Sequence, residues 1–158
     1  MSEETPSGSR YRQSPETVEW LLSTVREALE MDVAFVSEFA EDRLVFRVLE
    51  GDAESFGWRE GEGFPLDDSY CKRVLDGRIP NVVTDARSED STKELWVTNE
   101  ADIGSYVALP VVRSDGRPYG TLCCASHKAD PQLRERDLSL MQGIARELSR
   151  QLKREELR

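Results

Sequence analysis

The sequence predicts an α+β fold with a central antiparallel sheet of five or six strands. Two observations predict this arrangement. Apolar residues recur at helical spacing near both ends of the chain, and pairs of alternating apolar runs lie between them. Short hairpins require antiparallel pairing, and helices at both ends favour a layered α+β fold.

The first element is a helix that follows a polar tail. Residues 1–13 are expected to be a disordered N-terminal tail, with the domain at 14–154 and a helix end or tail at 155–158. Ser14 suits the N-cap of the first helix, and Pro15 suits its first turn. Five residues at helical spacing make one apolar stripe: Val18, Leu21, Leu22, Val25 and Leu29.

A strand hairpin and a mixed segment come next. Residues 32–40 and 43–50 alternate as strands do, and the short turn between them predicts a hairpin. Residues 51–63 form a glycine-rich loop, followed by a helix from about residue 67 that ends at Gly77.

The segment after this helix begins with a short strand at 81–84. Residues 85–102 are polar and are expected to be helical in pieces. Three residues are expected to anchor this segment in the core: Leu95, Trp96 and Ile103.

Residues 104–126, GSYVALPVVRSDGRPYGTLCCAS, contain the second hairpin. The Ser-Asp-Gly between its two runs predicts a tight turn, because Gly adopts the positive φ that such turns need. Strand alternation places Tyr106, Ala108 and Pro110 on one face, and Val107 and Leu109 on the other. Since both faces are apolar, this hairpin is expected inside the sheet. Proline has no amide hydrogen, so an edge or a break in the ladder is expected at position 110.

The last element is a helix expected from Gln132 to about Arg154. Its apolar residues step by 3 and 4, as in a coiled-coil seam. The seam consists of Leu138, Met141, Ala145, Leu148 and Leu152.

Size and charge limit the function. A chain of 158 residues is long enough for one domain with a single core. Its net charge of −10 disfavours nucleic acid and anionic membrane surfaces as partners. No apolar run is long enough to span a bilayer and the N-terminus is polar, so a cytoplasmic location is expected. Three cysteines, two of them adjacent, do not make a secreted disulfide framework.

Three local patterns resemble the GAF domain, a small-molecule-sensing relative of the PAS fold. The first is Ser-Tyr-Cys at 69–71, followed by Gly-Arg-Ile-Pro and a short strand that ends in Asp85. The others are the Gly-Ser-Tyr-Val-x-x-Pro strand at 104–110 and Asp-Gly-x-x-Tyr-Gly-Thr-Leu at 115–122. The resemblance runs from about Pro15 to Leu152. It implies that the terminal helices lie on one face of the sheet and that short helices and loops form a pocket on the other. It does not imply the ligand, because such domains bind chemically unrelated molecules or none.

The resemblance implies a small-molecule pocket with aromatic walls. The protein is expected to be a sensory or regulatory module that binds a small molecule non-covalently in this pocket. The identity of any cofactor is unknown. The alternative is that these aromatic residues only close a second core. The candidate ligand-binding residues are Trp58, Phe64, Tyr70, Cys71, Trp96, Tyr106, Ala108 and Pro110.

Thiol redox chemistry is the leading alternative function. Some GAF proteins reduce free methionine sulfoxide with pocket cysteines, and Cys71 lies where that family keeps one of them. A thiol near a helix N-terminus has a lowered pKa. The positions of the family's other two cysteines carry none here, so Cys123 and Cys124 are interpreted as structural.

Other family chemistries lack their residues. The Asn-Lys…Phe…Asp-Glu signature of cyclic-nucleotide-binding GAF domains is absent, and the segment before Gly104 lacks the Cys-His pair that attaches a bilin. The single histidine, His127, is interpreted as a solvated strand-end residue, since no second ligand at metal spacing accompanies it. No catalytic or metal-binding residue is assigned.

The terminal helices resemble those through which GAF proteins dimerise and relay a signal to an output domain or partner protein. A homodimer is therefore expected, and a ligandless dimerisation module is a third interpretation. The expected interface consists of Val18, Leu22, Val25, Met141, Ala145, Leu148 and Leu152.

Overall fold

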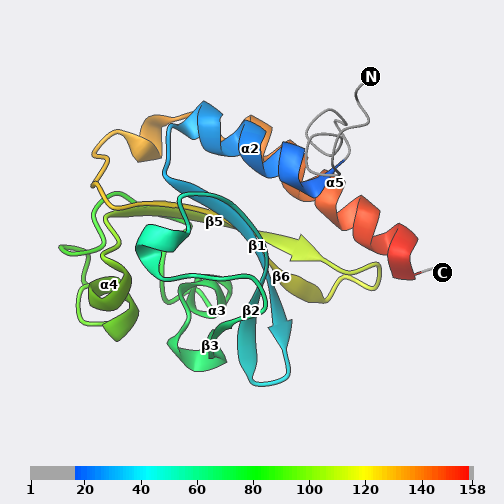
Figure 1. Ribbon diagram of the computed structural model, residues 1–158, viewed down its shortest axis with the longest axis horizontal. Coiled ribbons are helices and arrows are strands. Elements are labelled where there is room, and N and C mark those ends of the chain that lie inside the picture. The colour runs from blue at the N-terminus through cyan, green and yellow to red at the C-terminus, as the bar shows by residue number, and fades with distance from the viewer. Residues whose placement is uncertain (1–16, 157–158) are drawn as a thin grey trace.

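The structure is a computed structural model that describes residues 17–156, with side chains as far as residue 152. The predicted tail at 1–13 and the predicted cap at Ser14 lie outside the described residues. In the described part, one sheet is covered by helices on both faces (Figure 1).

The sheet confirms the predicted α+β class. Within residues 17–156 it has six strands in the order β3-β2-β1-β6-β5-β4, and all neighbouring pairs are antiparallel. Its centre joins the first strand of the chain to the last. The strands are β1 (Val33–Ala40), β2 (Arg43–Gly51), β3 (Gly63–Pro65), β4 (Val82–Val83), β5 (Ser105–Val112) and β6 (Pro118–Ser126).

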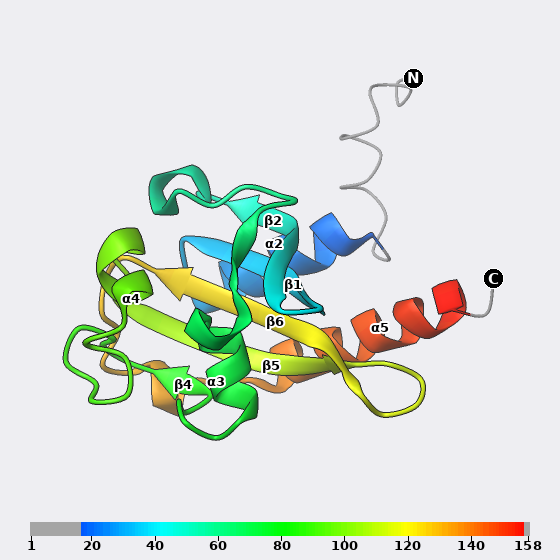
Figure 2. The same ribbon diagram turned by 90° about the horizontal axis from the view of Figure 1, so that it is seen from below.

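The helices are divided between the two faces as predicted (Figures 1 and 2). α2 (Val18–Leu29) and α5 (Ser139–Glu156) pack on one face. α3 (Tyr70–Leu75), α4 (Trp96–Ala101) and the 3-10 turn η2 (Glu54–Phe56) cover the other face.

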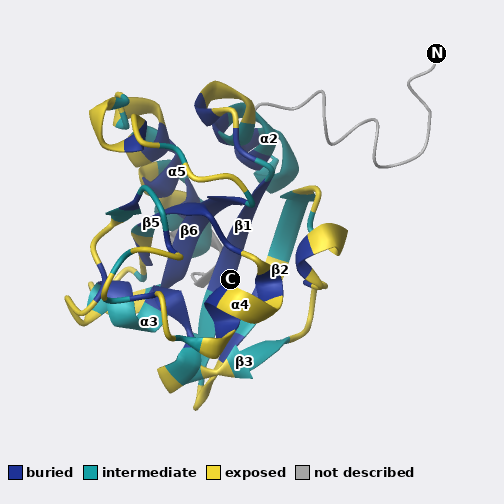
Figure 3. Ribbon diagram, turned by 90° about the vertical axis from the view of Figure 1, so that its left-hand side faces the viewer, coloured by how far each residue is buried: buried dark blue, intermediate teal, exposed yellow. Residues whose placement is uncertain are grey.

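Strand alternation divides the apolar side chains between two cores, as predicted. Tyr106, Ala108 and Cys123 lie in the core under α3 and α4, whereas Val107 and Cys124 lie under α2 and α5. All five side chains are at most 1% exposed. Figure 3 shows buried residues along the middle of the sheet. Adjacent cysteines therefore belong to different cores, and neither forms a disulfide.

The predicted start of the last helix is wrong. The chain first makes a 3-10 turn, η4 (Leu133–Glu135), and Arg136 is then extended, with φ −75° and ψ 150°. The carboxylate of Asp137 accepts a hydrogen bond from the Ser139 amide at 2.9 Å, so α5 begins there instead of at Gln132.

Hydroxyl side chains define the starts of two other helices. Thr17 Oγ1 accepts from the Trp20 amide at 3.3 Å and caps α2. Ser69 Oγ accepts from the Lys72 amide at 3.1 Å, so α3 begins at Tyr70, slightly later than predicted. Gly77, with φ 81°, turns the chain just after α3, where the sequence predicts the helix end.

The ladder of β5 is incomplete at Pro110, as predicted. β4 is only two residues long and pairs with Tyr106 and Val107, so no strand needs an amide hydrogen from Pro110 on that side. In the part of the chain that the structure describes, no helix is both long and apolar enough to cross a membrane.

Candidate functional site

The eight predicted ligand-binding residues fall into three groups. Trp58, Phe64 and Trp96 line one cavity on the α4 face of the sheet. Pro110 is exposed and lies away from it, in a shallow groove beside α5, so the structure separates it from the others. The remaining four are buried in the core on the cavity's side of the sheet: Tyr70, Cys71, Tyr106 and Ala108.

The cavity opens between η2 and α4 and has a volume of about 380 Å³. This size is suited to a small organic molecule. The side chains that line it supply four aromatic rings, two carboxylates and one hydroxyl. They include Phe56, Trp58, Phe64 and Trp96, together with Glu54, Ser55 and Glu100.

One wall of the cavity is a stack of rings. Phe56 lies between His127 and Trp58, with ring centroids 3.8 Å and 4.8 Å away. Phe64 meets Trp96 edge-on at 5.7 Å. Phe56 and Trp58 are almost fully buried, whereas Trp96 is 47% exposed. Trp96 is therefore part of the cavity wall and not the core anchor that the sequence predicts.

The local chain path of η2 presents both Phe56 and Trp58 to the cavity. Gly57 has φ 80° and its amide donates to the Glu54 carbonyl at 2.9 Å, which closes the turn. The Trp58 amide donates to the Ala53 carbonyl at 3.2 Å. The reversal at Gly57 holds the two rings against each other.

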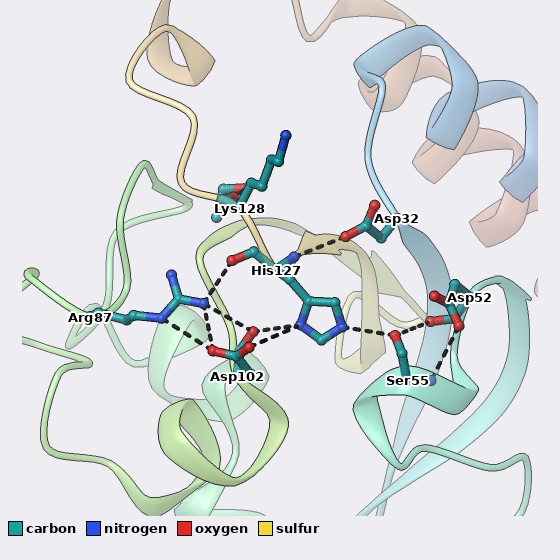
Figure 4. Close-up of polar contacts among 8 residues, drawn as sticks. Asp32, Asp52, Ser55, Arg87, Asp102, His127 and Lys128 are labelled. Atoms are coloured by element: carbon teal, nitrogen blue, oxygen red, sulfur yellow. Dashed lines mark hydrogen bonds and ion pairs between the residues drawn. The ribbon is translucent and has the colours of Figure 1, made fainter.

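His127 joins the two sides of the cavity (Figure 4). Its Nδ1 lies 2.7 Å from the backbone carbonyl of Asp102, directly after α4, and its Nε2 lies 2.8 Å from Ser55 Oγ in η2. A carbonyl only accepts, so Nδ1 donates to it, and in the neutral ring Nε2 then accepts from the Ser55 hydroxyl. The interpretation of His127 as merely solvated is therefore wrong, because the ring ties η2 to the end of α4.

The Ser55–His127–Asp102 arrangement does not match an activated nucleophile. The Asp102 carboxylate is paired with Arg87 Nη2 at 2.6 Å and lies 3.9 Å from the imidazole. Arg87 also donates to the His127 carbonyl at 2.7 Å. The carboxylate thus pairs with Arg87, and it is the peptide carbonyl of Asp102 that accepts the hydrogen bond from the imidazole. Within residues 17–156, no three His, Cys, Asp or Glu side chains are placed to hold a metal ion.

Comparison with known proteins identifies the family. The sequence matches the family model of the GAF domain over residues 15–152. The chain belongs to the GAF domain family. No curated protein sequence matches it.

Solved structures share the GAF fold with this chain. The blue-light absorbing form of the PixJ GAF domain from Thermosynechococcus elongatus has a TM-score of 0.65 at 16% identity, covering 96% of this chain and 90% of that one. A GAF domain region from Geobacter sulfurreducens PCA has a TM-score of 0.64 at 17% identity, with 92% and 97% covered. A bacteriophytochrome from R. palustris matches at 0.62 and 18% identity, covering 91% of this chain and 35% of its own.

A buried polar cluster lies in the GAF core on the cavity's side of the sheet. The ring of Tyr106 packs edge-on against Tyr70 at 4.8 Å, and the Tyr70 hydroxyl is hydrogen-bonded to Thr98 of α4. Burial raises the pKa of Tyr70 to about 12, although its hydrogen bond with Thr98 acts in the opposite direction. Cys71 and Cys123 complete the cluster, and their Sγ atoms are 3.4 Å apart.

The predicted dimer interface is mostly internal to the GAF domain. Val18 and Leu152 are partly exposed and line a groove of about 280 Å³ between the sheet and the ends of α2 and α5. The other five residues pack on their own sheet and are at most 7% exposed in the protomer. They are Leu22, Val25, Met141, Ala145 and Leu148.

Proposed function

We propose that this GAF domain is a cytoplasmic sensory module that binds an organic cation non-covalently between η2 and α4. The observation that carries the proposal is a cavity with aromatic walls and two carboxylates, those of Glu54 and Glu100. Aromatic faces attract organic cations, and a carboxylate adds Coulombic attraction. The net charge of −10 raises the local concentration of cations. Free cysteines at positions 71, 123 and 124 fit a reducing compartment.

The role of the ligand in this proposal is to shift a conformational equilibrium. η2 and α4 meet through the cavity and through His127, so a ligand that contacts both stabilises their closed arrangement. The cavity lies on one face of the sheet. The paired strands β1 and β6 belong to this sheet, and their opposite face carries α2 and α5. Binding would thereby bias the terminal helices and the output partner they contact.

The ligand proposal is tested with pairs of charged and uncharged probes. Quaternary and aromatic ammonium compounds, such as choline, are each compared with an uncharged carbon isostere by calorimetry and tryptophan fluorescence. The cation is expected to bind more tightly than its isostere. Glu100→Gln is expected to weaken binding about fivefold, which corresponds to roughly 1 kcal/mol.

A matched variant separates the cavity from the overall charge. Glu94→Gln removes an equal charge at an exposed position outside the cavity lining and should leave affinity unchanged. Equal binding of cation and isostere, or equal losses in both variants, would contradict the proposed ligand class.

We also infer that the module acts as a homodimer through the groove at the N-terminal end of α2 and the C-terminal end of α5. A second copy is the proposed occupant, because the apolar residues Val18 and Leu152 remain there after the protomer has packed its own helices. Figure 2 shows the last turns of α5 reaching past the sheet, where a partner helix could pack against them.

A further inference from the structure

Two thiols from distant parts of the chain meet in the core. Cys71 Sγ, from α3, lies 3.4 Å from Cys123 Sγ, from β6, and 52 positions separate them in sequence. The two residues are 2% and 0% exposed, and both are free. Disulfide formation would need the sulfurs to approach by only about 1.4 Å, to roughly 2.05 Å.

Three hydroxyl groups surround these thiols. Tyr106 Oη lies 3.2 Å from each sulfur. Thr121 Oγ1 accepts from the Cys123 thiol at 3.1 Å, and Ser37 Oγ donates to Cys71 Sγ at 3.6 Å. Every member of this cluster is at most 2% exposed.

The strand register creates the cluster. Ser37 of β1 is paired directly with Thr121 of β6, and their hydroxyls are 2.8 Å apart. Thr121 and Cys123 are two positions apart and so share a face. Burying five polar side chains in an apolar core is unfavourable unless they satisfy one another, which they do here.

The two thiols have different acidities. Burial raises the pKa of Cys71, but hydrogen bonds, chiefly with Cys123 and also with Tyr106 and Ser37, outweigh it and lower the pKa. Burial, together with the neighbouring Cys71, raises the pKa of Cys123 well above its usual value. One sulfur is therefore suited to attack and the other to hold its proton until the second step.

We propose that Cys71 and Cys123 form an oxidation site at which a small hydroperoxide converts the two thiols into a reversible disulfide. In the first step the Cys71 thiolate attacks the peroxide, the O–O bond breaks, and Cys71 becomes a sulfenic acid while water or an alcohol leaves. In the second step Cys123 attacks the Cys71 sulfur, the S–O bond breaks, and a second water leaves with the thiol proton. The thiols lose two electrons in total, and the peroxide gains them.

Access for the oxidant comes through α3. This helix has only six residues and is bordered by a 3-10 turn, η3 (Leu66–Asp68), and by Gly77. Such short elements open locally more readily than central strands. Hydrogen peroxide is close to water in size, so a brief opening at Cys71 admits it.

The test uses the folded, reduced protein and hydrogen peroxide as the oxidant. After treatment, the number of thiols that can be titrated in denaturant should fall from three to one. The mass should decrease by two hydrogen atoms, and peptide mapping should show a Cys71–Cys123 link that a dithiol reductant removes. Cys124→Ala is the matched control, because Cys124 lies on the opposite face of β6, and this variant should form the same link.

Two further variants separate the steps. Cys123→Ala should stop at a Cys71 sulfenic acid that dimedone traps, and Cys71→Ala should leave Cys123 as a thiol. If either variant fails to fold, peptide mapping of the wild-type protein still shows whether the Cys71–Cys123 link forms. The proposal is overturned if Cys71 and Cys123 remain thiols in the folded protein, if they link only after unfolding, or if Cys124 takes Cys123's place in the link.

Discussion

At the scale of single residues, Cys71 shows how hydrogen bonding can outweigh burial. The sequence predicts a lowered pKa from the position of Cys71 at a helix start. The structure gives a different cause, since the side chains of Cys123, Tyr106 and Ser37 on other elements are hydrogen-bonded to the sulfur and lower its pKa. Cys124, in the core on the opposite face of the sheet, has no such partners, and burial raises its pKa to about 12.

The pKa of Cys71 predicts a pH dependence of stability. A free thiol has a pKa of roughly 8.5, so the folded state releases the Cys71 proton first and gains stability as the pH rises between about 7 and 8.5. This gain is lost as the pH falls through the lowered pKa of the folded state. Denaturant unfolding under reducing conditions should show it for wild type and not for Cys71→Ser. If the difference in unfolding free energy between wild type and Cys71→Ser did not change with pH, Cys71 would stay protonated.

At higher pH, the folding stability should change with pH in the opposite direction. Burial raises the pKa values of Cys123, Cys124, Tyr70 and Tyr106, so these groups ionise more easily in the unfolded chain. Stability should therefore fall as the pH rises past about 9 in both wild type and Cys71→Ser.

Gly120 is a second residue with a specific prediction. A Cβ at this position would lie 1.8 Å from the Ser37 carbonyl, in the strand that also supplies the Ser37 hydroxyl to the thiol cluster. Gly120→Ala should destabilise the fold by about 1–3 kcal/mol, because backbone must move. Gly143→Ala is the control. It lies within α5, and its Cβ would meet only Arg146 Nη2 at 3.8 Å, so about 0.5–1 kcal/mol of stabilisation is expected. Thermal unfolding measures both, and an unaffected Gly120→Ala would contradict the close approach.

At the scale of elements, β5 and β6 show how far alternation alone determines packing. It correctly assigns Val107 and Tyr106 to opposite cores. Alternation does not predict how deeply a side chain is buried. Leu109 is only half-buried, because β5 extends beyond β4 there. Its cross-strand partner, Leu122, is fully buried.

Replacement by alanine should therefore reduce the folding stability by different amounts at Leu109 and at Leu122. Leu122→Ala should destabilise the fold by roughly 2–5 kcal/mol, since it removes buried methyl groups and leaves a cavity. Leu109→Ala should cost clearly less, because solvent can fill the space. Chemical denaturation of the two variants compares them directly. Equal losses would show that Leu109 is as deeply packed as its partner.

The limits of sequence reasoning have a physical pattern. Short-range signals located the helix stripes, the hairpins and the opposite faces of Cys123 and Cys124, because each depends on periodicity. The ring stack of Phe56 and His127, and the contact of Cys71 with Cys123, join segments more than fifty residues apart. No local pattern encodes such contacts. The wrong start of α5 has a local cause, the cap that Asp137 provides.

At the scale of the whole molecule, the sheet separates two kinds of surface. One face carries the cavity between η2 and α4, and the other carries α2 and α5 (Figure 1). β1, β5 and β6 contribute side chains to both cores, so these strands connect the two faces physically.

The proposed dimer gives the last prediction. Leu152 is half-buried beside Val18 in the groove, whereas Leu140 is 44% exposed near the other end of α5 and outside that groove. Leu152→Glu should dissociate the dimer, because a carboxylate would be buried at the twofold axis. Leu140→Glu adds the same charge to the same helix and should leave assembly intact.

Sedimentation at about tens of micromolar, where a weak interface is still occupied, distinguishes the two variants. Circular dichroism establishes that both remain folded. Since Leu148 packs on the sheet, it is unsuitable for this test, as a charge there would disturb the protomer itself. A monomeric wild type, or dissociation by Leu140→Glu alone, would show that the ends of α2 and α5 do not form the interface. The groove would then be a surface feature of a monomeric sensor.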